Sequence, residues 1–276
     1  MKKIKALVNH FLFKRWLKQK SKEIERKLSA AKTPEEKKLC LIFKNVAQNA
    51  FSDTEKTWFE KIEKLRTSID SDTSLIEITD YGAGNPSDNR SSQQMYEGSK
   101  SIARLCNVNI ASKGAFWAKI LFSLIKEFKP QIALELGTCL GISASYQACA
   151  MLLNEKGNLI TLEGSPSLAH RARKHFLALG IDNIEVVEGR FQDTLPLLLE
   201  QKKPFDYVFI DGHHDRMATI DYFNQIAPYL SQGAVLVFDD IFWSDGMRKA
   251  WQTISQDKRL SAVCDLEQIG ICIYKA

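Results

Sequence analysis

The stretch IALELGTCLGIS, residues 132–143, decides the fold of this 276-residue chain. Its first five residues are mostly apolar and predict a short buried strand, and the glycines at 137 and 141 predict a tight turn into a helix. Glycine lets the backbone approach a ligand closely, and the first turn of a helix offers free N–H groups. The spacing G-x-x-x-G differs from the G-x-G-x-x-G of dinucleotide-binding loops. A ligand-binding loop is therefore one interpretation, and a β–α turn without a ligand is the other.

Two acids accompany this loop. Glu135 lies two residues before it, where a carboxylate would repel a pyrophosphate but attract a ligand that carries an ammonium group. Glu163 follows the next strand, over 159–162. In doubly wound folds an acid at this place accepts hydrogen bonds from ribose hydroxyls. The two acids together favour the ligand-binding interpretation.

Outward from this stretch, strand-like runs alternate with helical stretches, which predicts βαβ units and a parallel sheet. Two last runs, 261–266 and 270–274, lie so close together that we expect an antiparallel hairpin. The domain expected over residues 113–276 has strands at 132–136, 159–162, 184–187, 207–210 and 234–238, and helices at 115–128, 141–154, 166–179, 192–200, 217–229 and 246–256.

Residues 1–112 are expected to form a helical N-terminal region. Thr33, followed by Pro34 and acids, is typical of a helix start. Helices are predicted up to residue 30, from 33 to about 50, from 52 to 69 and over 95–106, with a loop rich in Gly, Ser and Asn at 79–94. This region could cover a site or join two subunits of a homodimer, and both interpretations stay open.

The charge is concentrated at the N-terminus. Residues 1–50 carry a net charge of +10, whereas the remaining residues carry −5. Apolar residues recur there at helical spacing, at Ile4, Leu7, Val8, Phe11 and Leu12. Such a helix, within residues 1–28, can lie on an anionic membrane surface, or it can dock on neighbouring helices, which we favour. Nucleic-acid binding is disfavoured, because no known binding motif accompanies the basic residues.

The composition, 45% hydrophobic and 26% charged, excludes a disordered chain. No apolar run of about 18 residues predicts a membrane span, and Asn9 and His10 break the apolar start, so no signal peptide is expected. Six cysteines without a C-x-x-C pair argue against a structural zinc site and favour free thiols. We expect a cytoplasmic protein, with peripheral contact at the inner membrane face as the variant of that interpretation.

The E-x-G-x-x-x-G loop, the acid after the second strand and the closing hairpin resemble class I S-adenosylmethionine-dependent methyltransferases. The segments FDYVFIDGHHD, 205–215, and GAVLVFDDI, 233–241, resemble the fourth and fifth strands of catechol-type and related small-molecule O-methyltransferases. The resemblance covers roughly residues 130–245. One departure is Cys139, where many class I enzymes have a middle glycine.

This resemblance implies a Rossmann-like, seven-stranded doubly wound sheet in the order 3-2-1-4-5-7-6, with strand 7 antiparallel. It also implies an S-adenosylmethionine site. Glu163 would hold the ribose, and Phe191 would either touch the adenine or serve as a core aromatic of its helix. The other residues implied in cofactor binding are Glu135, Gly137, Thr138, Gly141, Ser143, Gly189, Gln192 and Asp211.

Three carboxylates, Asp211, Asp239 and Asp240, end the fourth and fifth predicted strands. Neighbouring strand ends lie about 5 Å apart, so these acids would repel one another unless a cation or protons offset them. Oxygen ligands suit Mg²⁺ or another hard divalent ion, and in catechol-type enzymes acids at these positions bind such a metal. The alternative is that Asp211 contacts cofactor or substrate directly, while the other two cap a loop or a helix.

His214 lies three residues after Asp211, at the position of the catalytic lysine of catechol-type enzymes. Histidine has a pKa suited to a general base near neutral pH, so we expect His214 to deprotonate the acceptor. The alternative is that His213 and His214 are polar loop residues beside a pocket. The turn over 80–85 is either a lid on the site or an ordinary surface turn.

Together these features predict O-methylation of a small-molecule hydroxyl. A membrane-proximal or lipid-linked acceptor, and a non-catalytic methyltransferase-like binding module, are the alternatives. An NAD-dependent oxidoreductase is disfavoured by the loop spacing. The acceptor and the oligomeric state are not determined by these patterns.

Overall fold

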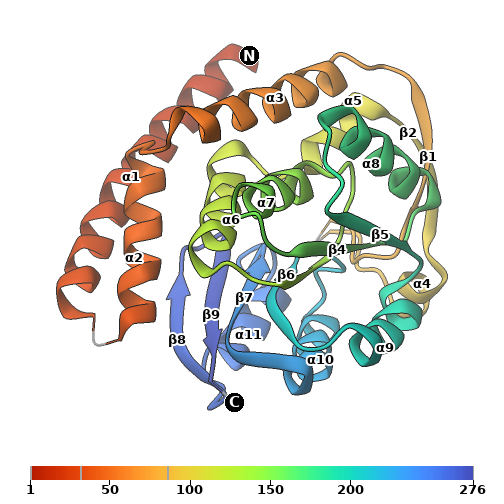
Figure 1. Cartoon of the computed structure of the whole chain (residues 1–276). Helices are drawn as coiled ribbons and strands as arrows, with labels where there is room; N and C mark the ends of the chain where they lie inside the picture. The colour runs from red at the N-terminus through yellow and green to blue at the C-terminus, as the bar shows by residue number, and fades with distance from the viewer. Residues whose placement is uncertain (1, 32, 86, 276) are drawn as a thin grey trace.

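The computed structural model describes residues 2–31, 33–85 and 87–275, excluding the side chains of residues 2–10 and 28. Figure 1 shows a central sheet with helices on both faces and a narrow two-stranded arm at one side. One face is covered by α6 (Ala115–Phe128), α7 (Ile142–Leu153) and α8 (Pro166–Leu179). The other face is covered by α9 (Phe191–Lys202), α10 (Arg216–Ile226) and α11 (Asp245–Ile254).

The central sheet has seven strands in the order β5-β4-β3-β6-β7-β9-β8. Counted from β3, this is the order 3-2-1-4-5-7-6, and β9 is antiparallel to both of its neighbours. The predicted doubly wound fold is therefore confirmed. The strands are β3 (Ile132–Leu136), β4 (Asn158–Glu163), β5 (Ile184–Glu188), β6 (Phe205–Ile210), β7 (Leu230–Asp239), β8 (Leu260–Asp265) and β9 (Ile269–Tyr274).

Alternation along β3 divides its side chains between two hydrophobic cores. Ala133 belongs to the core under α6 and α7, whereas Leu134 and Leu136 belong to the core under α9 and α10. A strand turns successive side chains to opposite faces of its sheet. Glu135 therefore lies on the face covered by α7, where its carboxylate is fully buried.

Three N-terminal helices form as expected: α1 (Lys2–Ala30), α2 (Pro34–Ala47) and α3 (Asp53–Asp70). Thr33 and Ser52 begin α2 and α3 with capping boxes, in which each side chain accepts from the third helical N–H and the Glu at that place accepts from the cap. Each box satisfies backbone donors that the first helical turn leaves free. These two starts were readable from the sequence.

Helix α1 packs on the domain through a different face from the predicted one. Trp16 lies against Phe43, Phe116 and Trp117 in an aromatic cluster, and its indole N–H donates to Glu267 over 3.0 Å. Phe11 and Leu12 of the predicted apolar stripe are instead 67% and 54% exposed. The other members, Ile4, Leu7 and Val8, have side chains outside the described set. The expected docking of this stripe is therefore wrong for Phe11 and Leu12. Helix α1 packs on α2 and α6 through its Trp16 face instead.

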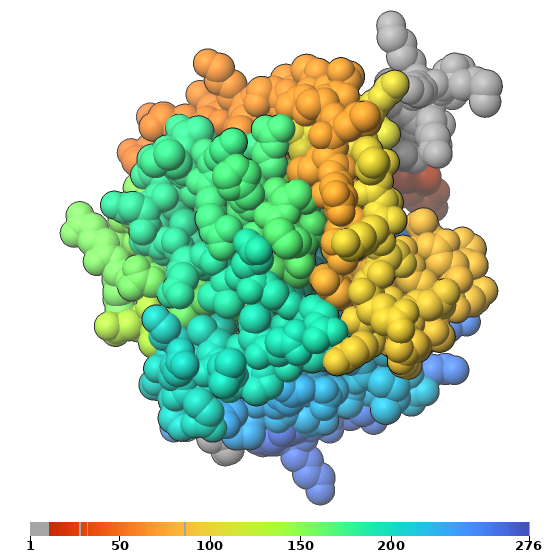
Figure 2. Space-filling view, turned by 90° about the vertical axis from the view of Figure 1, so that its right-hand side faces the viewer, coloured from red at the N-terminus to blue at the C-terminus, as the bar shows by residue number. Residues whose placement is uncertain are grey.

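The N-terminal region is not purely helical. Strands β1 (Leu75–Asp80) and β2 (Ser99–Arg104) pair antiparallel, with α4 (Ser92–Glu97) between them and α5 (Leu105–Val108) and a 3₁₀ turn (Asn109–Ala111) after them. The helix predicted over 95–106 is therefore wrong. Gly98, at φ +78, ends α4 early, and pairing with β1 satisfies the following backbone. Figure 2 shows this arm, orange to yellow, lying across one face of the domain against the green and teal segments.

Within the described ranges, no single helix is long and apolar enough to cross a membrane. The bent pair Leu105–Ala111 and Ala115–Phe128 passes by length and composition only, and its second helix contributes most of its apolar residues to the core.

Candidate active site

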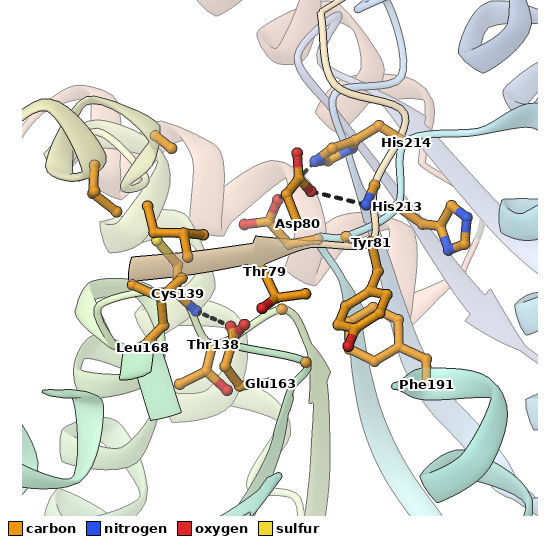
Figure 3. Close-up of a pocket in the computed structure, with 18 of the residues that line it drawn as sticks. Thr79, Asp80, Tyr81, Thr138, Cys139, Glu163, Leu168, Phe191, His213 and His214 are labelled. Carbon is orange, nitrogen blue, oxygen red and sulfur yellow. Dashed lines mark hydrogen bonds and ion pairs between the residues drawn. The ribbon is translucent and has the colours of Figure 1, made fainter. Parts of the chain in front are cut away.

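A cavity of about 440 Å³ opens where the carboxyl ends of β3, β4 and β6 meet the β1–β2 arm (Figure 3). In open α/β sheets, ligands bind at the carboxyl ends of the strands. The binding point is where the connections after two neighbouring strands run to opposite faces of the sheet. Residues from seven parts of the chain line the cavity: Ser101 of β2 and residues within 78–84, 107–113, 137–143, 163–168, 190–192 and 211–214.

Most residues predicted to bind a ligand meet at this cavity: Gly137, Thr138, Ser143, Glu163, Phe191, Gln192, Asp211 and His214. Five other predicted site residues are not part of its wall: Glu135, Gly141, Gly189, Asp239 and Asp240.

Glu135 is held beneath the glycine loop rather than in the cavity. Its Oε1 accepts from Ser143 Oγ over 2.7 Å and from Gln147 Nε2 over 2.8 Å, and its Oε2 accepts from Thr161 Oγ1 over 2.7 Å. Burial raises the pKa of the Glu135 carboxyl to about 7, although these donors act in the opposite direction. Glu135 therefore lies outside the cavity wall, because strand alternation turns its side chain under α7.

The glycines of the site have distinct steric roles. Gly137, at φ +105, allows the loop after β3 to meet β6, since a Cβ there would lie 2.0 Å from the carbonyl oxygen of Asp211. Gly141, at φ +79, begins α7, and a Cβ there would meet the Phe176 ring. Gly189 donates its N–H to the carbonyl oxygen of Glu163 over 2.9 Å. Gly141 and Gly189 thus shape the loops and do not face the cavity.

Glu163 lies at the end of β4 with its carboxylate directed into the cavity region, as Figure 3 shows. Its Oε2 accepts from the Cys139 N–H over 2.7 Å, and its Oε1 accepts from the Ser165 N–H over 2.9 Å. Burial raises the pKa of this carboxyl to about 7, against the effect of these two donors. Since a carboxylate can accept about four hydrogen bonds, Glu163 can still accept from two hydroxyl groups of a ligand.

Two aromatic side chains, Tyr81 and Phe191, also line the cavity. Figure 3 shows Tyr81 of the arm beside Phe191 of α9. The Tyr81 ring packs closely on Gly164 and Gly98, where an added Cβ would meet it at 2.6 Å. Phe191 lines the cavity and also packs edge-on against Tyr222, with ring centroids 5.8 Å apart. Phe191 therefore serves the core of its helix and the cavity wall at once, and a planar base could contact either ring.

The turn after β1 lines the cavity, which favours the lid on the site over the alternative of an ordinary surface turn. The Ala83 N–H donates to the carbonyl oxygen of His213 over 2.7 Å. Arg90 holds the turn by donating to Asp80 Oδ2 over 2.7 Å and to the Gly82 carbonyl oxygen over 2.9 Å. The arm and the loop after β6 are thus joined across the mouth of the cavity.

The two histidines have different environments. His213 Nδ1 lies 2.8 Å from the Tyr222 hydroxyl, and burial lowers the pKa of its imidazole. His214 Nε2 lies 3.8 Å from Asp211 Oδ1 at the cavity wall. His214 is therefore the histidine placed beside Asp211, as expected, and its role as a base stays a prediction.

A lysine missed by the sequence analysis lies among the three predicted metal-binding carboxylates. The ammonium of Lys113 forms an ion pair with Oδ2 of Asp239, and their side chains are only 5% and 1% exposed. Burial alone would lower the pKa of Lys113, but the charges of Asp211, Asp239 and Asp240 outweigh it and raise the pKa above its usual value. Lys113 is thus a buried ammonium.

The carboxylates respond to this ammonium unequally. Burial raises the pKa of Asp211 well above its usual range, and the neighbouring Asp239 raises it further. Burial also acts to raise the pKa of Asp239, but Lys113 lowers it below the usual value. Asp239 is therefore the ionised partner, and Asp211 is the member that most readily carries a proton.

This arrangement does not fit the expected divalent metal site at Asp211, Asp239 and Asp240. Across the described part of the chain, no three His, Cys, Asp or Glu side chains are placed to hold a metal ion. The physical reason is that Lys113 already directs its positive charge at Asp239. No sequence motif marks Lys113, which precedes α6 and is brought to the carboxylates only by folding.

The sheet order, the cavity at the carboxyl strand ends and the acid ending β4 define a Rossmann-like protein that binds a nucleoside-type ligand. Residues 134–241 match the family model described as "Methyltransferase domain". The chain is 35% identical over 125 residues to catechol O-methyltransferase B of Danio rerio, covering 44% of this chain and 47% of that protein. It is 31% identical over 126 residues to catechol O-methyltransferase of Sus scrofa, covering 45% of this chain and 67% of that protein.

Among solved structures, an O-methyltransferase from Bacillus cereus in complex with SAH has the same fold. Its TM-score is 0.53 at 24% identity, over 61% of this chain and 85% of that one. The chain belongs to the class I S-adenosylmethionine-dependent O-methyltransferase family. It spans about half the length of the first curated relatives it matches.

Proposed function

We propose that this protein transfers a methyl group from S-adenosylmethionine to a hydroxyl of a small-molecule acceptor. The observation that carries the proposal is that one cavity joins Glu163, an acid suited to a ribose, to the Asp211–His214 pair, suited to proton removal. The family relationship supports the same reaction class. When bound, the cofactor supplies a methyl group activated by a sulfonium.

The residues present fit this cofactor. The Glu163 carboxylate would accept from the ribose hydroxyls, and Tyr81 and Phe191 would contact the adenine. Gly137 allows a close backbone approach, and Thr138 and Ser143 line the same part of the wall. The turn after β1 would exclude water by covering the ligand.

His214 would take the proton of the acceptor hydroxyl. It lies at the cavity wall, 3.8 Å from Asp211, so a proton that it accepts leaves an imidazolium beside an acid. A positioned general base contributes about 10²–10⁴-fold to a rate. The substitution of histidine for the catalytic lysine of catechol-type enzymes favours an acceptor other than catechol itself.

The first experiment is a calorimetric titration of S-adenosylhomocysteine into the purified protein. We expect micromolar binding, about −8 kcal/mol. Glu163→Gln should weaken it at least tenfold. Glu188→Gln is the matched control, since Glu188 pairs with Glu163 in the sheet register but is exposed and does not line the cavity. Equal losses in both variants, or no binding by the native protein, would contradict the cofactor site.

Turnover is tested next with a panel of hydroxylated small molecules. The proposal expects methyl transfer that Asp211→Ala abolishes while the far-ultraviolet spectrum stays unchanged. Tight binding of S-adenosylhomocysteine without transfer to any acceptor would favour the non-catalytic binding module instead.

A membrane-proximal acceptor is the second candidate, and the exposed end of α1 favours it. Phe11 and Leu12 project into solvent close in sequence to Lys14, Arg15 and Lys18. Apolar and basic residues together bind anionic lipid surfaces. Co-sedimentation with vesicles containing anionic lipid should fall for a Phe11→Ser, Leu12→Ser double variant. Equal sedimentation of native and variant protein would count against this candidate, and against peripheral attachment at the inner membrane face.

A further inference from the structure

The backbone of Lys113 is held in place by a chain of contacts that begins in α3. Its backbone carbonyl accepts from Arg66 Nη2 of α3 over 2.6 Å. Arg66 is paired with Glu63, whose Oε1 also accepts from the Tyr146 hydroxyl of α7 over 2.9 Å. The lysine therefore enters the site from a fixed backbone and not from a mobile loop.

The ammonium group of Lys113 meets the carboxyl end of β7 at a point between the strand ends and the cavity. It pairs with Asp239, which is 1% exposed, while Lys113 itself lines the cavity. An ammonium has three N–H donors. Asp239 takes one, so the others are available to Asp211 or to an oxygen atom that enters the cavity.

The charge of Asp239 is offset by Lys113 without another cation. A divalent ion bound by Asp211, Asp239 and Asp240 would have to share its ligands with an adjacent ammonium, and like charges at such distances repel strongly away from water. Binding of the ion therefore requires that Lys113 leave Asp239. The hydrogen bond from Arg66 to the Lys113 carbonyl oxygen fixes the backbone, so only the side chain of Lys113 could make that movement.

We propose that Lys113 takes the place of a divalent metal ion in this site. This inference rests on the proposed function and names the group that would stabilise the acceptor oxygen. Lys113 neutralises Asp239 and donates to the acceptor oxygen. As that oxygen bonds to the methyl carbon, the carbon–sulfur bond breaks with its electron pair on sulfur, and the hydroxyl proton passes to His214. Lys113 keeps its proton throughout, and the transfer requires no metal.

The test is a Mn²⁺ titration followed by electron paramagnetic resonance, on the native 276-residue protein and on Lys113→Met. We expect the native protein to leave Mn²⁺ free and the variant to gain one site. Asp239→Asn, added to Lys113→Met, should remove that site. Lys126→Met is the control, because Lys126 lies on α6, the helix that follows Lys113, but donates to the Leu153 carbonyl oxygen.

Stoichiometric Mn²⁺ binding by the native protein, lost in Asp239→Asn, would overturn the proposal. So would a folded Lys113→Met that binds no Mn²⁺, since the lysine would then not be filling a cation site. If Lys113→Met does not fold, the native titration alone decides.

S-adenosylhomocysteine binding, measured on the same samples, separates this inference from the proposed function. Binding of both ligands by the native protein would refute the lysine assignment and keep the methyltransferase. Binding of neither would refute the cofactor site and keep the metal-free carboxylate cluster.

Discussion

The backbone N–H of Cys139 donates to Oε2 of Glu163 over 2.7 Å, so the loop after β3 positions the acid at the end of β4. Cys139 stands in place of a glycine common in class I enzymes, and it adopts the left-handed φ of +49 that this contact uses. Together with the Ser165 N–H, the contact fixes both oxygens of Glu163 before any ligand is present. The same enclosure removes Glu163 from water and makes its ionisation costly.

Stability should consequently fall as pH rises through the neutral range. The pKa values of Glu135 and Glu163 are raised to about 7, above the ordinary value of 4.5. Between these values the native state holds protons that the unfolded chain has lost, so the contribution of these carboxyls to the free energy of unfolding decreases with pH. Urea denaturation from about pH 5 to about pH 8 measures how the free energy of unfolding changes with pH. Each unit by which a carboxyl pKa is raised corresponds to about 1.4 kcal/mol. Glu135→Gln should reduce this pH dependence and Glu188→Gln should not; equal slopes in all three proteins would contradict the assignment.

Gly137→Ala should lower the free energy of unfolding by far more than the strain of placing alanine in a left-handed conformation. Its Cβ would lie 2.0 Å from the Asp211 carbonyl oxygen, so β3 and β6 would have to separate at the cavity floor. Gly180→Ala is the control, since Gly180 has φ +73 but open space around it. We expect a loss of about 1 kcal/mol for Gly180→Ala, from backbone strain, and more than about 3 kcal/mol for Gly137→Ala in urea denaturation. Similar losses would mean that the close approach has little energetic weight.

The sequence predicted the α/β domain well, because its strands are short apolar runs that alternate with longer helical stretches. The site residues found this way lie in loops at strand ends, such as Glu163, Asp211 and His214. Glu135 was predicted to contact the cofactor, whereas strand alternation puts its side chain on the same face as Ala133, outside the cavity wall. Ser143 and Gln147, four apart on α7, are the partners that could have revealed its buried position.

Tyr81 and Lys113 illustrate what the sequence could not provide. Tyr81 reaches the cavity from the β1–β2 arm, where β1 was not predicted and β2 was predicted as helix, and Lys113 reaches it from the segment just before α6. The β1–β2 pairing is decided by contacts between residues 19 to 29 positions apart. It also depends on packing beside α8, where Thr79 donates its N–H to Ser165 Oγ over 3.2 Å. Short polar strands have little propensity signal of their own, so tertiary context decides them.

Tyr81→Ala should weaken binding of S-adenosylhomocysteine without unfolding the protein. The ring closes the cavity beside Phe191 and packs on Gly164, next to Glu163. Loss of an aromatic contact with a base costs about 1–3 kcal/mol. We therefore expect calorimetry to give a Kd that is about five- to hundredfold higher. Ile102→Ala serves as the control, because Ile102 lies on the same arm but is 71% exposed. An unchanged Kd in Tyr81→Ala would place the adenine elsewhere.

His214→Gln should lower kcat by about 10²–10⁴-fold while the affinity for S-adenosylhomocysteine stays the same. The separation is expected because His214 lies beside Asp211 at 3.8 Å, whereas Glu163 holds the ribose end. His170→Gln on the exposed surface of α8 is the control. A parallel loss of affinity and kcat would indicate that His214 shapes the cofactor site and does not act on the acceptor.

The buried Lys113–Asp239 pair should show strong coupling in a double-mutant cycle. Lys113→Met leaves the Asp239 carboxylate without its charge partner, which typically costs about 3–5 kcal/mol, whereas removing both charges leaves no buried ion uncompensated. Asp239→Leu should therefore recover much of the stability lost in Lys113→Met, as measured by urea denaturation. The exposed pair of Lys203 and Glu200, 3.0 Å apart, is the control and should show little coupling. The alternative outcome is that the double variant loses the sum of the stabilities lost in the two single variants. In that case the ammonium would not be neutralising Asp239, and the cluster would need another cation.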